Sequence, residues 1–327
     1  MPKVLGNKKD GNAKSHGYLV TGFHSMDHAF NPHNEGLGIP FGTLWEIFGA
    51  PATAKSTTAY SLASMLAAHL DTGWILLDAE DAFTPDYVST IGENHGMSEN
   101  TYIVLAKGKY HEERLKDIFT QMHNEVVGVG IIDSLGMLAS RAEVGGELGE
   151  ANMGKRAFLI NQWVRQFFMQ KNLDFGYLPP HATVFMINHQ QPAFSGYGTV
   201  RPGGTGKDYG AGVRVHLKRE EEFSDGSLLI TGTIKKLRWS GGGMDNTFQF
   251  VSKVGYGMHK GLSAIMDLKK MKAVRFYKGV ISAGETKFPH KFSYYLKTND
   301  EKDFEPFYEL LGSHKTDSLS EEVEEEE

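Results

Sequence analysis

The run GAPATAKST at residues 49–57 constrains the fold of this chain more than any other segment. It directly follows a strand-like apolar run, LWEIF. A strand, a tight turn that bears glycine and a Lys-Ser pair that opens a helix together form a P-loop, in which backbone N–H groups and the helix N-terminus face phosphates. The segment therefore predicts a site for a nucleoside triphosphate.

The positions of this loop have separate expected roles. Lys55 is expected to contact the β- and γ-phosphates of ATP, and the Ser56 hydroxyl to hold Mg²⁺. The other residues are expected to line the phosphates: Gly49, Ala50, Pro51, Ala52, Thr53, Ala54 and Thr57. Ala54 replaces the usual second glycine, and because it stands where the helix begins we expect right-handed dihedral angles there. A chance Lys-Ser helix start after a strand is the alternative.

Short apolar segments alternate with helix-like segments from residue 18 to about residue 251. Strands are expected at 43–48, 73–77, 128–132, 183–187, 213–217 and 228–235, and helices at 56–69, 85–92 and 153–171. Such alternation predicts an α/β fold with a mostly parallel central sheet covered by helices. The later strands have no helix between them, so we expect the sheet to end in antiparallel hairpins.

The composition divides the chain into four parts. Residues 1–17 are polar and basic and are expected to form a loose arm ahead of the core at 18–251. Residues 252–312 are expected to form a small α+β domain. Residues 313–327 are expected to be a disordered acidic tail. Seven acids and no base lie in its last eleven residues, and removing their charges from the net −6 leaves +1.

The composition also indicates in which part of a cell the protein is located. The chain has no cysteine, which excludes disulfides and thiolate metal sites. No apolar run approaches the ~18 residues that cross a membrane, and the amino terminus lacks the apolar core of a signal peptide. We therefore expect a cytoplasmic protein with no membrane partner.

Two further strand ends carry acidic residues. The run WILLDAEDAFTPDY ends a strand that we expect beside the P-loop strand, which would place Glu80 near the γ-phosphate to polarise the attacking water. Solvated acids at a strand end are the alternative. The run VGVGIIDSLG is a Walker B pattern, so Asp133 is expected to bind Mg²⁺ through water.

Four segments, in this order, resemble the RecA-type recombinases. They are VTGFHSMDHAF before the P-loop, RAEVGGELGEANMGKRA at 141–157, VFMINHQ, and PGGTGKDYGAGVRVHL. The second resembles the first DNA-binding loop and its following helix, and the last two flank what resembles the second DNA-binding loop. His189, the DSLGMLAS run, Ala54 and GYGMHKGLSAIMDL resemble the UvsX-like recombinases of tailed phages.

The resemblance implies a RecA-type ATPase core and a function. It implies a DNA-dependent ATPase that uses ATP and Mg²⁺, assembles as a helical filament on single-stranded DNA, and exchanges strands with homologous duplex DNA in recombination, repair and recombination-dependent replication. It further implies a single-stranded-DNA-binding protein and a loading mediator as partners, in the cytoplasm of a host bacterium. About 20 residues precede Thr21, which is short for the family's full polymerisation arm, although a strand at 2–5 could dock on a neighbouring sheet edge.

The resemblance also assigns roles at the ATP site. Glu80 would activate water, Tyr87 would pack on adenine, and His189 would sense the γ-phosphate in place of glutamine. Lys236 and Arg238 would reach the phosphates of a neighbouring subunit. Because side chains alternate along a strand, these two share one face and Lys235 points the other way.

Two loops are implied to contact DNA. Beside the first, at 143–152, basic side chains are expected to bind: Arg141, Lys155 and Arg156. In the second, at 190–205, Phe194 and Tyr197 are expected to stack on bases, and Arg201 to bind phosphate. Gly203 and Gly204 are expected to let the backbone approach phosphate closely. The acidic tail would either promote solubility or compete with DNA for the basic groove.

Two other functions fit parts of the sequence. The first is a RecA-fold motor, helicase-like or repair-accessory, that has the same nucleotide motifs but does not exchange strands. The second is a non-hydrolysing DNA-binding paralogue, which Ala54 and His189 favour. ATP turnover stimulated by single-stranded DNA would separate the recombinase from both.

Overall fold

A computed structural model describes residues 17–30, 38–98, 102–124, 127–145, 154–171, 177–192, 199–238 and 246–313. Its centre is a nine-stranded sheet with the order β13-β12-β11-β10-β3-β7-β6-β4-β5. The parallel strands are β3 (Leu44–Gly49), β4 (Gly73–Asp78), β5 (Ile103–Leu105), β6 (Val127–Asp133), β7 (Thr183–His189) and β10 (Val213–Glu222). The strands β11 (Leu228–Leu237), β12 (Thr247–Lys253) and β13 (Gly257–His259) extend it in antiparallel pairs. The predicted α/β class and the antiparallel end of the sheet are both confirmed.

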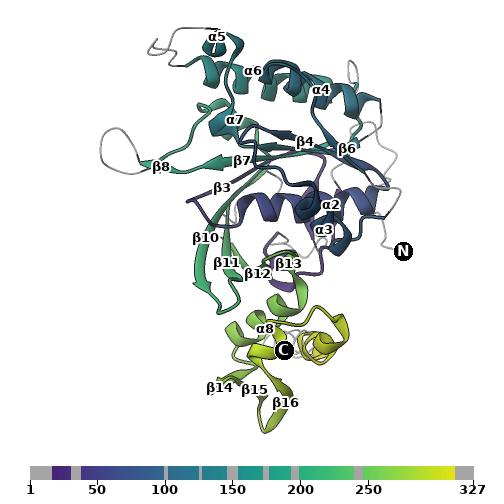
Figure 1. Cartoon of the computed structure of the whole chain (residues 1–327), viewed down its shortest axis with the longest axis vertical. Helices are drawn as coiled ribbons and strands as arrows, with labels where there is room; N and C mark the ends of the chain where they lie inside the picture. The colour runs from purple at the N-terminus through teal and green to yellow at the C-terminus, as the bar shows by residue number, and fades with distance from the viewer. Residues whose placement is uncertain are drawn as a thin grey trace, which may run out of the picture.

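Helices cover both faces of the parallel part (Figure 1). The helices α2 (Lys55–Leu70) and α3 (Pro85–Asn94) lie on one face, and α4 (His111–His123) and α6 (Lys155–Gln170) lie on the other. This coverage explains why every residue of β3 and β6 is buried, as continuous apolar runs in parallel sheets usually are. The two faces carry two apolar clusters, one around Trp45 and Leu66 and the other around Ile118 and Phe167.

Shorter elements complete the core. They are β1 (Gly17–Leu19), α1 (His24–Ala29), β2 (Ile39–Phe41), the 3₁₀ turn η1 (Leu135–Met137), α5 (Arg141–Val144), the pair β8 (Gln191–Pro192) and β9 (Thr199–Val200), and α7 (Gly206–Gly210). The buried Asp27 accepts hydrogen bonds from the backbone N–H groups of Thr21 and Gly22, which fixes the turn before α1. Within the described ranges, no helix is both long and apolar enough to cross a membrane.

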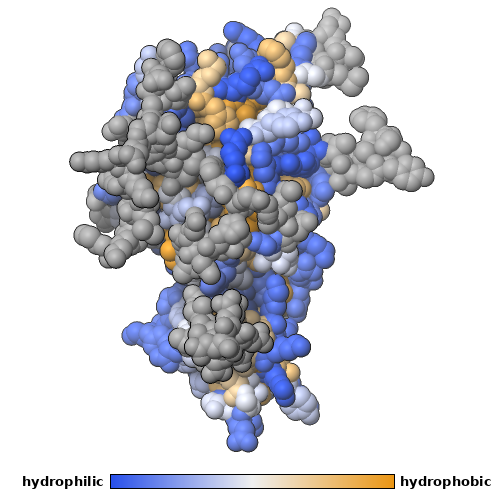
Figure 2. Space-filling view, turned by 180° about the vertical axis from the view of Figure 1, so that it is seen from behind, coloured by the Kyte–Doolittle hydropathy of each residue, from blue (hydrophilic) through white to orange (hydrophobic). Residues whose placement is uncertain are grey.

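The C-terminal part continues from the edge of the central sheet (Figure 1). It contains α8 (Lys260–Lys270), the antiparallel strands β14 (Arg275–Tyr277), β15 (Val280–Ala283) and β16 (Thr286–Lys291), α9 (Phe292–Tyr295) and the 3₁₀ turn η2 (Glu301–Phe304). Figure 2 shows a mostly hydrophilic surface over this lower part of the molecule, seen from behind. Its apolar cluster includes Phe223 and Val251 from the central sheet. The expected boundary after residue 251 falls within β12, so the two parts share a core at this edge.

Candidate functional site

The P-loop connects β3 to α2 through two alanines in left-handed conformation. Ala52 has φ 56° and Ala54 has φ 57° and ψ 30°. The expected right-handed geometry of Ala54 is therefore wrong. The reason is that Ala54 is the residue before the first helical position, where the backbone is not yet helical. The turn has the shape for which the usual motif has a glycine, and alanine adopts it at a cost of about 1–2 kcal/mol.

We expect Ala54→Gly to raise the free energy of unfolding by about 1 kcal/mol, because glycine has no Cβ to clash at positive φ. Ala68→Gly, in the last turn of the same helix, is the matched control and should lower it by up to about 1 kcal/mol. Urea denaturation followed by circular dichroism measures both changes. A loss of stability in the first variant would contradict the left-handed geometry.

Lys55 lies at the start of α2 with its ammonium over the loop. Its Nζ donates to the carbonyl of Ala50 at 2.7 Å, and only 6% of the residue is exposed. Burial lowers the pKa of Lys55, while the nearby carboxylates of Asp133 and Glu80 oppose that shift. Gly49 precedes this turn where the backbone passes Leu217 closely, since a Cβ there would lie 2.3 Å from the Leu217 carbonyl oxygen. The structure thus gathers the predicted phosphate-binding lysine and two acids.

Glu80 follows β4 and accepts two strong hydrogen bonds. Ser134 Oγ donates to its Oε1 at 2.6 Å, and His189 Nε2 lies 2.7 Å from the same oxygen. Burial opposes ionisation, but the hydrogen bonds from Ser134 and His189 and the charges of His189 and Lys55 together lower the pKa of Glu80. A carboxylate held ionised in this way accepts hydrogen bonds and can orient a water molecule, whereas its lowered pKa makes it a weaker base.

The position of β4 differs from what we expected. It is not the neighbour of the P-loop strand, because β7 and β6 lie between them. The turn after β4 nevertheless brings Glu80 to His189, which ends the strand next to β3. The expectation that β4 pairs with β3 is therefore wrong. Glu80 is nevertheless close enough to the P-loop for the charge of Lys55 to lower its pKa.

Asp133 and Ser56 lie beside each other near Lys55. The carboxylate of Asp133 accepts a hydrogen bond from the hydroxyl of Ser56. Tyr60 Oη donates to the same carboxylate at 3.0 Å. Burial raises the pKa of Asp133 above its usual range, even though these two hydrogen bonds favour the charged form. A hydroxyl beside a carboxylate is a donor set that suits Mg²⁺. Sequence reasoning missed Ser134 and Tyr60, although Ser134 stands next to the Walker B aspartate.

Tyr87 and the basic pair on β11 have contacts within the chain. Tyr87 Oη lies 2.8 Å from Thr57 Oγ1, which brings its ring to the first turn of α2. Lys236 Nζ donates to the carbonyls of Asp208 and Tyr209 at 2.7 and 2.9 Å, and Arg238 Nη2 donates to Tyr209 at 2.6 Å. Lys236 and Arg238, which directly follows the end of β11, therefore point to the same carbonyl, whereas Lys235 is exposed.

The basic residues beside the first loop that we expect to bind DNA lie at the starts of two helices. Arg141 begins α5 and its guanidinium lies 4.5 Å from the centre of the Tyr110 ring. Lys155 and Arg156 begin α6. These three basic residues flank 146–153, which lie outside the described residues, as do Phe194 and Tyr197 in the second loop.

The end of the second loop differs from expectation. Arg201 is 21% exposed, and its guanidinium pairs with Glu46 at 2.9 Å and lies 4.4 Å from the centre of the Phe48 ring. It is therefore engaged inside the protein instead of being presented to phosphate. Gly203 and Gly204 have φ 102° and 71°, and a Cβ on either would lie 3.0–3.1 Å from side chains of α6. Their backbone shape and helix packing are sufficient reasons for glycine.

Comparisons with known proteins agree with this geometry. A family model described as the RecA N-terminal domain matches residues 4–247. The chain is 27% identical to Protein RecA of Streptomyces rimosus over 197 residues. The aligned part covers 59% of this chain and 49% of that protein. The chain is also 26% identical to Protein RecA of Listeria monocytogenes over 202 residues, and the aligned part covers 61% of this chain and 54% of that protein. The chain thus spans about half the length of the curated relatives it matches.

Proposed function

Because this chain belongs to the family of the RecA N-terminal domain, we propose that it is a DNA-dependent ATPase that assembles on single-stranded DNA and promotes homologous pairing and strand exchange. The observation that carries the proposal is the bonding of Glu80 to both Ser134 and His189 beside Lys55. This contact supports the proposal, because it brings a carboxylate and a histidine side chain together beside the P-loop lysine.

Each residue of the site has a separate role in ATP hydrolysis. The loop 49–57 binds the phosphates through its backbone N–H groups and through Lys55, and Tyr87 packs on the base. Ser56, directly, and Asp133, through water, would hold Mg²⁺. Mg²⁺ supplies charge neutralisation when it is bound. Glu80 orients the attacking water and takes its proton, and His189 connects that carboxylate to the end of β7. Lys236 and Arg238 act on the phosphates of a neighbouring subunit in a filament.

The DNA side and the partners follow from the same family. Arg141, Lys155, Arg156, Phe194 and Tyr197 contact single-stranded DNA, which is then paired with a homologous duplex. A single-stranded-DNA-binding protein and a loading mediator assist assembly, and the acidic residues 313–327 either promote solubility or compete with DNA for the basic groove. His189 and Ala54 support a kinship with the UvsX-like recombinases of tailed phages, and hence a place in the cytoplasm of an infected bacterium. The chain up to the end of β13 supplies the ATPase core, and the part from α8 onward supplies a C-terminal domain.

The deciding experiment is ATP hydrolysis by the full chain with and without single-stranded DNA, followed by a strand-exchange assay. Strong stimulation by DNA together with strand exchange supports the proposal. Hydrolysis that is indifferent to DNA would identify a different RecA-fold motor. DNA binding with no hydrolysis would identify a non-hydrolysing paralogue.

The loop aromatics are expected to contribute separately to DNA binding. Phe194→Ala and Tyr197→Ala should each weaken binding of an oligothymidine by about 5- to 150-fold, since stacking of a base on an aromatic ring is worth about 1–3 kcal/mol. Fluorescence anisotropy at one fixed salt concentration measures the change, because affinity for DNA depends steeply on salt. Tyr277→Ala, which removes a tyrosine 71% exposed on β14, is the control and should leave the affinity unchanged.

A further inference from the structure

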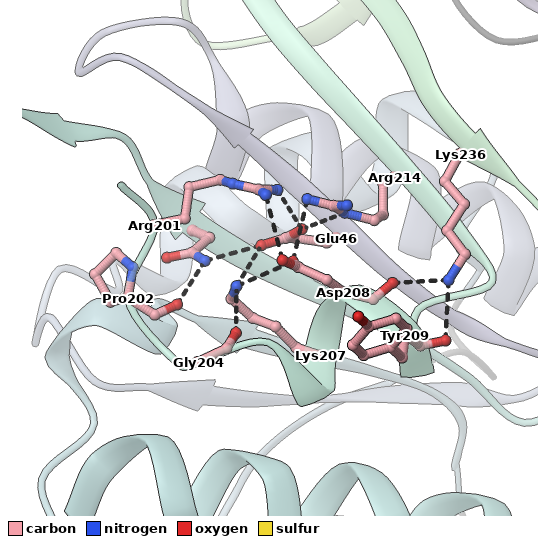
Figure 3. A network of polar contacts seen from close by, with 10 residues as sticks. Glu46, Arg201, Pro202, Gly204, Lys207, Asp208, Tyr209, Arg214 and Lys236 are labelled. Atoms are coloured by element: carbon pink, nitrogen blue, oxygen red, sulfur yellow. Dashed lines mark hydrogen bonds and ion pairs between the residues drawn. The ribbon is translucent and has the colours of Figure 1, made fainter. Parts of the chain in front are cut away.

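A buried carboxylate lies at the centre of the largest ionic network among the described residues (Figure 3). Glu46 stands in the middle of β3 and is 0% exposed. Arg201 Nη1 and Arg214 Nε donate to its Oε2 at 2.9 and 2.8 Å. Asn188 Nδ2 donates to its Oε1 at 2.9 Å, and Lys207 Nζ lies 3.5 Å from the same oxygen. We call these five residues and Asp208 the Glu46 cluster.

The Glu46 cluster has more positive than negative charge. Asp208 is its second carboxylate and pairs with Arg214 at 3.1 Å, Lys207 at 3.2 Å and Arg201 at 3.5 Å. Three cations therefore share two carboxylates, and Lys207 is itself only 1% exposed. Buried ion pairs are a poor source of stability, but removal of one partner leaves a charge without compensation. The arrangement therefore favours one relative position of the segments that it joins.

Four members of the Glu46 cluster lead to different parts of the proposed site. Glu46 is three residues before Gly49 on the P-loop strand, and Asn188 directly precedes His189. Asn188 Nδ2 also donates to the carbonyl of Pro202 at 3.0 Å, so it contacts the end of the second DNA loop. Arg201 lies in the last part of that loop.

The basic pair on β11 is connected as well. Asp208 belongs to α7, and the carbonyls of Asp208 and Tyr209 accept the hydrogen bonds of Lys236. Figure 3 shows Lys236 reaching these carbonyls beside the side chains that surround Glu46. One cluster thus contacts the P-loop strand, the strand that ends at His189, the end of the second loop and the segment that holds Lys236.

We propose that Glu46 is a positioning residue that couples DNA occupancy of the second loop to the ATP site. The inference rests on the proposed function, because it concerns how DNA binding changes hydrolysis. A movement of the loop end shifts Arg201 and Pro202, and the shared bonds to Glu46 and Asn188 carry that shift to His189 and hence to Glu80. Glu46 does not itself contact nucleotide or DNA in this scheme.

Glu46→Gln tests the coupling, because it keeps the shape of the side chain and removes its charge. We expect the KM for ATP and the hydrolysis rate without DNA to change little. The stimulation of kcat by single-stranded DNA should fall by about 5- to 150-fold, the usual range of coupling between two sites. Glu222→Gln is the matched control, since it removes the exposed ion pair with Arg219 on the same sheet and should leave the stimulation intact.

Two further measurements keep the proposal open to refutation. If Glu46→Gln does not fold, Asp208→Asn removes the more exposed carboxylate of the cluster and should reduce the stimulation in the same direction. Hydrogen exchange at 183–190 and 206–210, followed on addition of oligothymidine, reads the coupling without hydrolysis. Exchange in these segments should respond to DNA in the wild type and not in Glu46→Gln.

The outcomes separate the two proposals. A folded Glu46→Gln protein with full DNA stimulation, or with a wild-type exchange response, overturns the positioning role. A wild-type chain that binds DNA without hydrolysing ATP overturns the proposed function, and the exchange experiment then still decides the role of Glu46.

Discussion

Replacement of Glu80 by glutamine is expected to lower the rate of ATP hydrolysis about 100- to 10,000-fold, the usual contribution of a general base. Glutamine keeps the length of the side chain and a carbonyl oxygen that Ser134 and His189 can reach. It cannot accept a proton from water at neutral pH. ATP binding should be retained, because Lys55 and the loop amides are unchanged.

The measurement is single-turnover hydrolysis at saturating ATP with single-stranded DNA present. Ser134→Ala is the companion variant, because it removes one of the two hydrogen bonds that hold the carboxylate. It should reduce the rate far less, by about 10-fold for a hydrogen bond worth about 1.4 kcal/mol. Glu80→Gln protein with a near wild-type rate would mean that another group takes the proton.

Acid is expected to destabilise the folded chain through His259, which is 0% exposed. It stacks on Tyr256 at 4.5 Å and contacts Phe304 at 5.1 Å between ring centres. Burial lowers the pKa of His259 to about 3, whereas an unfolded chain has a histidine pKa of about 6.5. Between these two values the unfolded state binds more protons, so stability is full above about pH 6.5 and falls as the pH is lowered.

The expected magnitude can be isolated with a variant. Between pH 7 and pH 5 the wild type should lose about 2 kcal/mol more than His259→Asn, since each pH unit in this window is worth about 1.4 kcal/mol. Asparagine is chosen because His259 Nδ1 caps α8 by accepting from Leu262 N at 3.3 Å, and asparagine is a good capping residue. Urea denaturation at both pH values gives the four free energies. Equal losses in the two proteins would show that His259 does not titrate as a buried neutral ring.

A second buried group near α8 acts in the opposite direction. Burial raises the pKa of Asp267 to about 6, so the folded state binds the extra proton between this value and the unfolded value of about 3.9. Stability from this group is present at low pH and is lost as the pH rises through about 6. Asp267→Asn should therefore make the acid loss of the wild type steeper, which distinguishes the two contributions.

Local signals in the sequence predicted the parts of this fold that depend on neighbouring residues. The P-loop strand, expected at 43–48, is β3 (Leu44–Gly49), and the helix expected at 56–69 is α2 (Lys55–Leu70). The order of strands was not predictable in the same way, because two strands that lie between β3 and β4 come later in the chain. The left-handed conformation of Ala54 was not predicted, because the conformational preference of alanine is an average over many proteins. It does not determine the dihedral angles in one particular loop.

The polar contacts at the site were the least predictable. Glu46 and Arg201 are 155 positions apart in the sequence, so no spacing rule brings them together. Arg201 looked like a phosphate ligand because a basic residue in a glycine-rich loop usually faces solvent. Ser134 and Asp133 were adjacent in sequence, and a hydroxyl directly after the Walker B acid was a signal that could have been used.

The shared core at the edge of the central sheet limits how the C-terminal part can be exchanged. Phe223 and Val251, from β10–β11 and β12, pack with Leu262 and Phe307 in one apolar cluster. A chimaera joined after residue 251 would therefore pair a foreign α8 with side chains selected for this one, and it would cut β12. For protein engineering, the natural unit of transplantation is the C-terminal part together with the antiparallel strands on which it rests.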